Sequence, residues 1–344
     1  MVQIDRLNET LLHGVNDFNK RAWCFPDSPE FLNWFFRDSP NTTVLVAHEQ
    51  GRWLSVLGVF DRTYLIGGEP VICGETYAWQ TADECRGRGI GIKVIKAMID
   101  LGRPLVALGG SPDTLSFMPR LGFETVAQAP ALNLLLSPRA IGAQAGVAGL
   151  SGPKAVLARL GLTLLAPVMR PTAPAWSAIR NVPLPVLDQE TLDMPSLPGF
   201  QALYEQAFFE WLMMVPARPG SFLPFRFQRD GELVGWAFAR VAEEGPGELV
   251  GRILELKFAP QTTAADQKAM AAAVVQALAG FGVIIVRALA TCAATNGALR
   301  ALRFIARTKL PAMVQPAGRT LASEPIRCSM LRADGALLPL SARA

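Results

Sequence analysis

The sequence lacks the features that mark a nucleic-acid-binding or membrane-spanning protein. Its 33 basic and 29 acidic residues give a formal net charge of +4. This balance gives no reason to expect a nucleic-acid partner. The longest apolar run, residues 155–169, is interrupted by Arg159 and is too short to cross a bilayer. We therefore expect no membrane insertion.

The cysteines show neither metal-ligand spacing nor a disulfide framework. There are five, at Cys24, Cys73, Cys85, Cys292 and Cys328. An odd count without paired spacing favours reduced thiols, and no metal cofactor is expected. The first residues, 1–9, are polar and lack the apolar segment of a secretory signal. A cytoplasmic location is the expectation.

The length and hydrophobicity are those of a protein with more than one domain. The chain has 344 residues, of which 50% are hydrophobic. A chain of this length is long for one domain and sufficient for two, each with its own core.

The most informative stretch is rich in glycine and runs from Arg86 to Gly91; we call it the glycine loop. Residues 71–81 before it have the pattern of a strand. Residues 92–99 after it continue a helical spacing of apolar side chains. The first N–H groups of a helix have no partner within the helix, and its dipole favours an anion there. This arrangement predicts a phosphate-binding turn.

The spacing of the glycines discriminates between known phosphate-binding motifs. No Lys-Ser/Thr pair follows, as a Walker loop requires, and the spacing is not Gly-x-Gly-x-x-Gly. The pattern present is Arg-x-x-Gly-x-Gly, filled by Arg86, Gly89 and Gly91. It resembles the coenzyme A pyrophosphate loop of the GCN5-related N-acetyltransferases, the GNAT superfamily. A glycine-rich surface turn is the alternative.

The order of predicted elements extends this resemblance over residues 1–140. Before the loop we expect helices over 8–21 and from residue 29, and strands over 44–48, 53–60 and 71–81. After it we expect a strand over 105–108, a short helix over 114–120 and a strand over 131–136. The turn Leu121-Gly122-Phe123 stands before the last strand. The resemblance implies an α/β fold in which helices flank a mixed central sheet.

The second part of the chain repeats the first. Gly58 follows Trp34 by 24 residues, and Gly235 follows Trp211 by 24. A predicted hairpin, a strand over 252–260, a helix over 264–278 and a strand over 283–290 come next. Residues 296–304 then end in Leu-Arg-Phe, where the first half has Leu-Gly-Phe. This predicts a second GNAT-like domain over 191–335, joined by a linker with a short helix over 141–190. Chance similarity between two ordinary α/β domains is the alternative.

The two halves differ at the loop. Residues 261–267 contain no glycine, and Asp266 would repel a phosphate. We therefore expect only the first half to bind a cofactor and regard the second as degenerate. The whole chain resembles tandem GNAT proteins, and among them the amino-sugar N-acyltransferases of bacterial polysaccharide biosynthesis.

The resemblance implies transfer of an acetyl or other short acyl group from acyl-CoA to the amine of a small molecule. Transfer would be direct, within a ternary complex, and a nucleotide-linked amino sugar is our first choice of acceptor. The cleft between the halves would hold the acceptor. Arg218, Arg226 and Arg229 there are either diphosphate ligands or solvated cations. The sequence leaves monomer and homo-oligomer both open.

The resemblance also assigns cofactor-binding residues. Trp79, Gln80 and Thr81 would hold the pantetheine arm through the backbone of their strand. The pyrophosphate would lie against the glycine loop, which comprises Arg86, Gly87, Arg88, Gly89, Ile90 and Gly91.

Two residues are candidate general bases. Glu75 shares a strand face with Tyr77 and Trp79, and GNAT enzymes often carry a glutamate there. An ion-paired glutamate is an equal alternative. His48 is the second candidate, because an imidazole titrates near neutrality.

A general acid is not evident. Met118 stands where the family commonly has a tyrosine, and a thioether cannot donate a proton. Ser116 is a nearby alternative, although a hydroxyl on a helix face is its simpler role. A non-catalytic acyl-CoA-binding sensor or assembly subunit is therefore the alternative function.

Overall fold

The computed structural model describes residues 1–22, 29–137, 140, 179–195, 200–215, 220–245, 247–318, 326–327 and 329–331. The helix expected within 141–190, together with Cys24, Arg218 and Cys328, lies outside these residues. Among the described residues, no helix is both long and apolar enough to cross a membrane.

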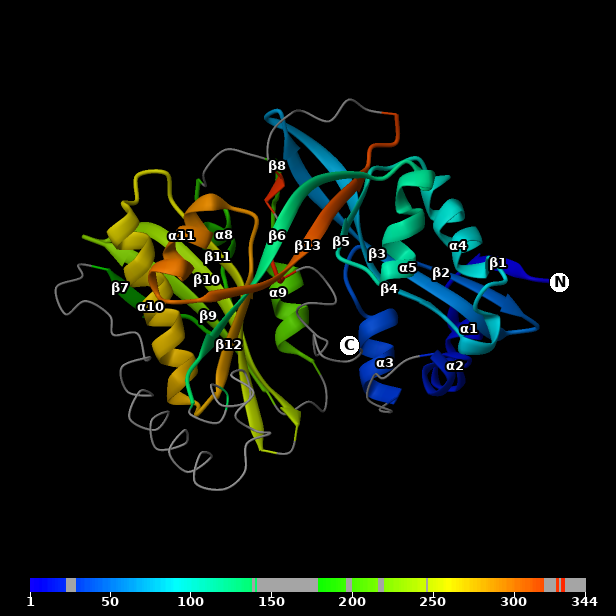
Figure 1. Cartoon of the computed structure of the whole chain (residues 1–344), viewed down its shortest axis with the longest axis horizontal. Helices are drawn as coiled ribbons and strands as arrows, with labels where there is room; N and C mark the ends of the chain where they lie inside the picture. The colour runs from blue at the N-terminus through cyan, green and yellow to red at the C-terminus, as the bar shows by residue number, and fades with distance from the viewer. Residues whose placement is uncertain are drawn as a thin grey trace, which may run out of the picture.

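The first half contains the strands and helices expected from its pattern, in the expected order (Figure 1). Its strands are β1 Gln3–Arg6, β2 Thr42–Glu49, β3 Arg52–Ile66, β4 Glu69–Thr81, β5 Leu105–Leu108 and β6 Glu124–Leu135. Its helices are α1 Glu9–Leu12, α2 Val15–Ala22, α3 Pro29–Phe36, α4 Ile90–Ile99 and α5 Pro112–Phe117, with 3₁₀ turns at Asp83–Cys85 and Met118–Leu121.

The second half repeats this order from α9 onward. Its strands are β7 Arg180–Pro183, β8 Phe200–Ala202, β9 Gly220–Arg229, β10 Glu232–Gly245, β11 Glu248–Phe258, β12 Ile285–Leu289, β13 Ile305–Gln315 and β14 Ile326–Arg327. Its helices are α8 Gln189–Leu192, α9 Gln206–Met213, α10 Ala264–Gly280 and α11 Ala293–Ala301.

One predicted helix, over 8–21, is wrong in detail because it is divided at Gly14. The Trp53 indole N–H donates to the carbonyl of Leu11 at 2.8 Å, and the N–H of Gly14 donates to the same carbonyl at 2.9 Å. A Cβ on Gly14 would lie 2.7 Å from Cδ1 of Trp53. The indole therefore displaces the helical backbone and leaves two shorter helices, α1 and α2.

A second predicted helix, over 114–120, begins earlier and ends as a 3₁₀ turn. Ser111 caps α5 by accepting the N–H of Thr114 at 3.2 Å. Pro119 has no N–H with which to continue an α-helix, so the chain tightens at Met118–Leu121.

The strands form one continuous sheet whose order is symmetric about its centre. The order is β1-β2-β3-β4-β5-β13-β6-β12-β11-β10-β9-β7 within a 14-stranded sheet. Strand β13 of the second half pairs with β5, and β6 of the first half pairs with β12. Strand β6 of the first half therefore joins the strands of the second half, and β13 of the second half joins those of the first. The two strands pair with each other at the centre of the sheet (Figure 1). This confirms the tandem arrangement predicted from the repeated pattern.

The two tryptophans that revealed the repeat meet each other. Trp34 of α3 and Trp211 of α9 stack with ring centroids 4.4 Å apart. Each indole N–H donates to the other residue's carbonyl, at 3.0 and 3.2 Å. The contact is reciprocal, as expected of equivalent residues on either side of a pseudo-two-fold axis.

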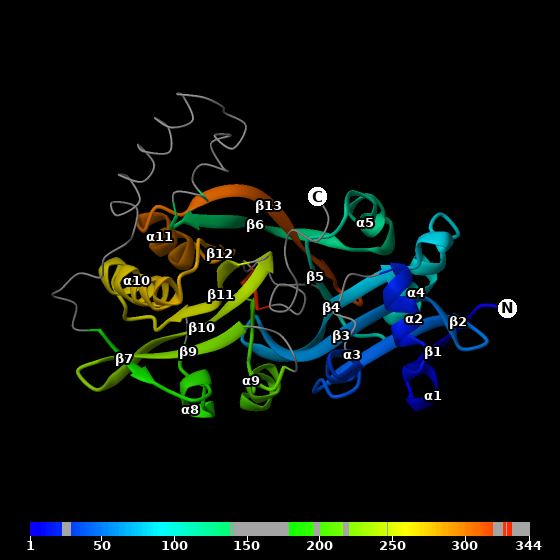
Figure 2. The same cartoon turned by 90° about the horizontal axis from the view of Figure 1, so that it is seen from below.

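Helices cover both faces of the sheet (Figure 2). Helices α4, α5, α10 and α11 lie on one face, and α3, α8 and α9 lie on the other. Between α3, α9 and the first-half strands, aromatic rings fill the core: Phe60 stacks on Tyr77 at 4.4 Å and meets Phe208 edge-on at 5.8 Å. This face is therefore packed from both halves.

Candidate active site

The strand that leads into the glycine loop separates from its neighbour. Strand β4 pairs with β5 only at Gly74–Leu105 and Glu75–Val106. Ala78 has a φ of +55° beside a shift in the β3–β4 register, so β4 carries a bulge three residues beyond the last pair with β5. Trp79, Gln80 and Thr81, predicted to hold the pantetheine arm, lie on the stretch that pairs with β3 but not with β5. We call the opening between β4 and β5 the first splay.

The Trp79 side chain extends from β4 toward helices α4 and α5. Its ring meets Phe117 of α5 edge-on at 5.5 Å. Its indole nitrogen lies 3.5 Å from the position that a Cβ on Gly91 would take. The indole thus connects the start of α4 with α5.

The glycine loop leaves the start of α4 open. Gly87 and Gly89 have φ values of +76° and +70°, and nothing lies within 4 Å of a Cβ built on either. Gly89 is the N-cap residue and no side chain caps the helix. Within the described chain, the N–H groups of Gly87 and of residues 89–91 have no hydrogen-bond acceptor. Such a set of unpartnered donors at a helix start suits a phosphate.

Gly91 has a different role from the other two glycines. A Cβ at this position would lie 2.7 Å from the Thr81 hydroxyl. Ser55 fixes that strand end, because its hydroxyl lies 3.0 Å from the Thr81 hydroxyl and donates to the Gln80 carbonyl at 2.7 Å. Gly91 therefore allows α4 to begin directly against β4. Sequence reasoning did not identify Ser55.

The loop arginines are exposed. Arg86 pairs with Asp83 at 2.9 Å, and both side chains are about 60% exposed. Arg88 lies within 3.6 Å of the Cys85 sulfur. An exposed ion pair of this kind contributes little to the stability of the fold. Arg86 can therefore leave Asp83 and contact a phosphate with little loss of stability.

Glu75 is held in a buried ion pair. The Nε–H of Arg62 donates to Oε2 of Glu75 at 2.7 Å, and the Tyr64 hydroxyl donates to Oε1. Glu75 is 2% exposed. The Arg62 guanidinium lies 3.7 Å above the Phe208 ring and 5.2 Å from the Tyr204 ring, both from the second half. The structure thus places Glu75 in the ion-paired arrangement that the sequence had left as an alternative.

His48 lies at the turn between β2 and β3. Its Nε2 is 2.9 Å from Oδ2 of Asp5, and its Nδ1 accepts the N–H of Gly51 at 3.2 Å. The residue is 6% exposed. Both ring nitrogens therefore have partners that secure β1 and the hairpin turn.

The remaining sequence candidates have structural contacts. Met118 is buried, and the Ser116 hydroxyl donates to the Asp113 carbonyl at 2.7 Å. Arg226 contacts Glu190 at 2.9 Å and Asp188 at 3.3 Å, and Arg229 contacts Asp266 at 2.8 Å. Arg226 and Arg229 are thus ion-paired within the second half, and their role as diphosphate ligands stays a prediction.

The equivalent helix start in the second half is closed by its own side chains. Thr263 accepts the N–H of Asp266 at 3.2 Å, and Asp266 accepts the N–H of Thr263 at 2.9 Å. Burial raises the pKa of Asp266, but the Thr263 hydrogen bonds and the Arg229 charge outweigh it and leave the pKa below its usual value. An ionised carboxylate thus occupies the start of α10, where the first half has an open turn.

This cap gives a measurable contribution to stability. We expect Asp266→Ala to lower the free energy of unfolding by about 1 kcal/mol at pH 7. Because the folded pKa is depressed, the contribution is present above the ordinary pKa of 3.8 and is lost as the pH falls through the folded value. Urea unfolding at several pH values should show that the difference in free energy of unfolding between Asp266→Ala and the wild type, the stability gap, becomes smaller in acid. Asp113→Ala, at the start of α5, is the control, and a gap independent of pH would contradict the assignment.

Comparison with known proteins agrees with this geometry. Residues 3–125 match the family profile described as an acetyltransferase (GNAT) domain. No curated protein matches the sequence.

Solved structures match over almost the whole chain. A GCN5-related N-acetyltransferase from Anabaena variabilis has a TM-score of 0.59 at 10% identity, covering 92% of this chain and 73% of that one. Saccharomyces cerevisiae N-myristoyltransferase with bound myristoyl-CoA has a TM-score of 0.58 at 12% identity, covering 94% and 84%. A tandem GNAT protein from the clavulanic acid biosynthesis pathway has a TM-score of 0.58 at 14% identity, covering 93% and 100%. Residues 3–125 therefore match a GNAT acetyltransferase domain, and the chain over its length has the fold of a tandem GNAT protein.

Proposed function

We propose that the protein is an N-acyltransferase that moves an acetyl or other short acyl group from acyl-CoA to the amine of a small molecule. The observation that carries this proposal is the uncapped start of α4 beside the first splay. Bound there, acyl-CoA supplies an acyl group already activated as a thioester.

The residues present fit such a ligand. The unpartnered N–H groups of Gly87 and residues 89–91 form a turn suited to a pyrophosphate, and Arg86 and Arg88 add positive charge. The unpaired edge of β4 at Trp79, Gln80 and Thr81 offers backbone groups to the pantetheine arm. The S. cerevisiae N-myristoyltransferase, which shares the fold, was solved with myristoyl-CoA.

Cofactor binding belongs to the first half alone in this proposal. We place the acyl-CoA-binding domain in residues 1–140 and a degenerate GNAT-like domain in 191–335, joined by 141–190. The Thr263–Asp266 cap supports the distinction, because the Asp266 carboxylate and the Thr263 hydroxyl each already accept one N–H group at the start of α10. A second anion there would meet a like charge.

Of the two candidate bases, we assign proton acceptance to Glu75. It lies on β4 at the last pair with β5, three residues before the bulge at Ala78, and its carboxylate accepts hydrogen bonds from Arg62 and the Tyr64 hydroxyl. His48 lies at the β2–β3 turn with both ring nitrogens engaged. Met118 offers no acid, and a thiolate leaving group needs little assistance because an ordinary thiol pKa is about 8.5.

Two measurements test the proposal. Acetyl-CoA should raise the melting temperature, and thiol release with a panel of amines, including nucleotide-linked amino sugars, should identify an acceptor. Glu75→Gln should reduce turnover at every pH if Glu75 accepts the proton. Full turnover of that variant across the pH range would show that water, and not Glu75, accepts the proton.

The alternative is an acyl-CoA-binding sensor or assembly subunit. The ion pair of Glu75 and the burial of Met118 favour it, because neither residue contacts solvent freely. Stabilisation by acetyl-CoA without thiol release from any amine would support this alternative.

A further inference from the structure

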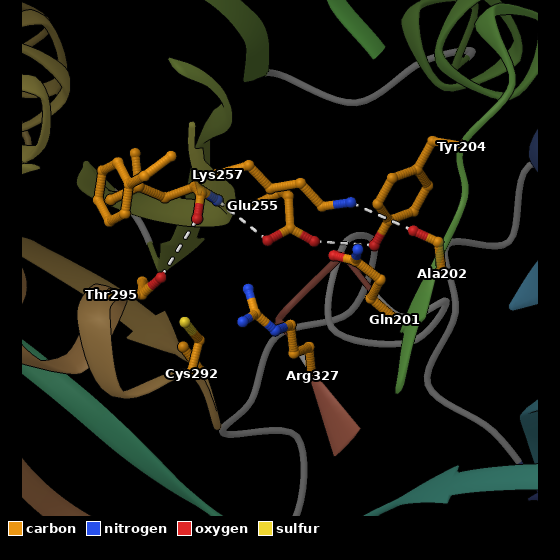
Figure 3. Close-up of a pocket in the computed structure, with 11 residues that line it drawn as sticks. Gln201, Ala202, Tyr204, Glu255, Lys257, Cys292, Thr295 and Arg327 are labelled. Atoms are coloured by element: carbon orange, nitrogen blue, oxygen red, sulfur yellow. Dashed lines mark hydrogen bonds between the residues drawn. The ribbon is translucent and has the colours of Figure 1, made fainter. Parts of the chain in front are cut away.

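A pocket lies in the second half at the place that corresponds to the first splay (Figure 3). Strand β11 pairs with β12 only as far as Ile253–Ala288, and residues 255–258 continue without it. The pocket lies between this strand end, β8, β14 and the start of α11. Its lining residues are Gln201, Ala202, Tyr204, Glu255, Leu256, Lys257, Phe258, Ala290, Cys292, Thr295 and Arg327. We call it the β11 pocket.

Two cationic side chains enter the β11 pocket from different elements. The ammonium of Lys257 lies 4.9 Å from the Tyr204 ring and 5.5 Å from the Trp236 ring, and it donates to the Ala202 carbonyl at 3.2 Å. Arg327 extends into the pocket from β14, on the side of Cys292 (Figure 3). The elements that supply these cations, β11 and β14, are far apart in sequence.

The one acidic residue of the lining is satisfied by the protein itself. Glu255 accepts the Tyr204 hydroxyl at 2.8 Å, the Ser329 hydroxyl at 2.7 Å and the Leu256 N–H at 3.1 Å. These donors stabilise its charge within the wall. The lining therefore carries one more positive than negative charge.

The start of α11 adds to the positive potential. This helix has nine residues, and its N-cap residue, Cys292, makes no side-chain capping bond. The corresponding helix of the first half, α5, is capped by the hydroxyl of Ser111. A thiol in place of that hydroxyl leaves the first N–H groups of α11 available beside the pocket. The uncapped start of α11 thus lies on the side of the pocket into which Arg327 extends, and Lys257 lies on the opposite side, beside Ala202 and Tyr204 (Figure 3).

We propose that the β11 pocket binds the anionic group, a carboxylate or phosphate, of a small ligand distinct from acyl-CoA. Arg327 and the first turn of α11 contact the charge, and Lys257 adds positive potential from the opposite wall. The capped start of α10 excludes the pyrophosphate of a second coenzyme A from this half. The inference does not depend on the proposed acyl transfer, because it concerns binding at a separate site.

Cys292 provides the test, because its thiol lies within the lining. Iodoacetate and iodoacetamide both alkylate a thiol, forming a sulfur–carbon bond as iodide leaves and the proton passes to buffer. Only iodoacetate is negatively charged. The ratio of the two rates at Cys292, followed by mass spectrometry of its peptide, should be about five-fold higher in the folded protein than in urea, as for one unit charge near 4 Å in water.

Variants identify the source of the preference. Arg327→Gln should reduce the iodoacetate preference several-fold, whereas Arg300→Gln, at the opposite end of α11, should leave it unchanged. Lys257→Met, which keeps an apolar stem against the Tyr204 and Trp236 rings, is a second variant if Arg327→Gln does not fold. A preference that survives both substitutions at the pocket would overturn the proposal.

Competition requires no variant. Inorganic phosphate and glutamate, added separately at equal ionic strength, should slow alkylation of Cys292 by iodoacetamide. Protection by phosphate alone assigns a phosphate ligand, and protection by glutamate assigns a carboxylate. Protection by coenzyme A but by neither small anion would place the cofactor in the second half and refute the proposal.

Discussion

Gly89→Glu is expected to abolish stabilisation of the protein by coenzyme A. Gly89 is the N-cap of α4, with a φ of +70° and open space around it, so the new carboxylate would project beside the unpartnered N–H groups. A unit charge 4 Å from a diphosphate of two charges costs about 2 kcal/mol even at the dielectric constant of water. The affinity for coenzyme A should therefore fall at least about thirty-fold, measured by calorimetry or thermal shift.

Strain must be separated from charge in this experiment. A non-glycine residue in the left-handed region costs about 1–2 kcal/mol wherever it is placed. Gly102 has a φ of +77°, is exposed and also has nothing within 4 Å of a Cβ. It follows the opposite end of α4, so Gly102→Glu should lower the melting temperature similarly and leave coenzyme A binding intact. Equal loss of binding in both variants would show that the helix start is not the phosphate site.

The glycine loop could be predicted because its signal is local. The φ values of Gly87 and Gly89 are set within the loop itself, and the close approach at Gly91 is to Thr81, at the end of the strand that leads into the loop. A hexapeptide between a strand pattern and a helix pattern therefore contains most of the information that shapes the turn.

The exchange of strands was not predictable from the same evidence. The apolar pattern of residues 131–136 predicts a strand but does not say which strand will be its neighbour. Its partner β13 lies in the other half, and the stretch from Glu124 is extended because it pairs with that strand. Pairing over such a separation depends on how the halves meet, which no local pattern encodes.

The surroundings of Glu75 were partly predictable. Alternation places Arg62 and Tyr64 on one strand face, but the register that brings both beside Glu75 depends on the β3–β4 hairpin. The rings of Tyr204 and Phe208 come from the second half. Sequence reasoning therefore found the residue but could not decide between a base and an ion pair.

Arg62→Met is expected to be among the most destabilising single substitutions in the first half. It would leave the Glu75 carboxylate, which is 2% exposed, buried without the positive charge of Arg62. The Tyr64 hydroxyl would still donate to it. Removing one partner of a buried ion pair costs about 3–5 kcal/mol, because the other charge is left without compensation. Urea unfolding of the variant should show this loss as a lower midpoint with an unchanged slope.

A second substitution distinguishes lost charge compensation from lost packing. Glu75→Gln in the Arg62→Met background removes the stranded charge while keeping an acceptor for the Tyr64 hydroxyl, so the double variant should be more stable than Arg62→Met alone. Arg37→Met, which breaks an ion pair with Asp38 between side chains that are both 47% exposed, should leave the urea midpoint close to that of the wild type. If the double variant were instead less stable than Arg62→Met, the stacking of Arg62 on Phe208 would be the main contribution, and Glu75 would not require its partner to remain buried.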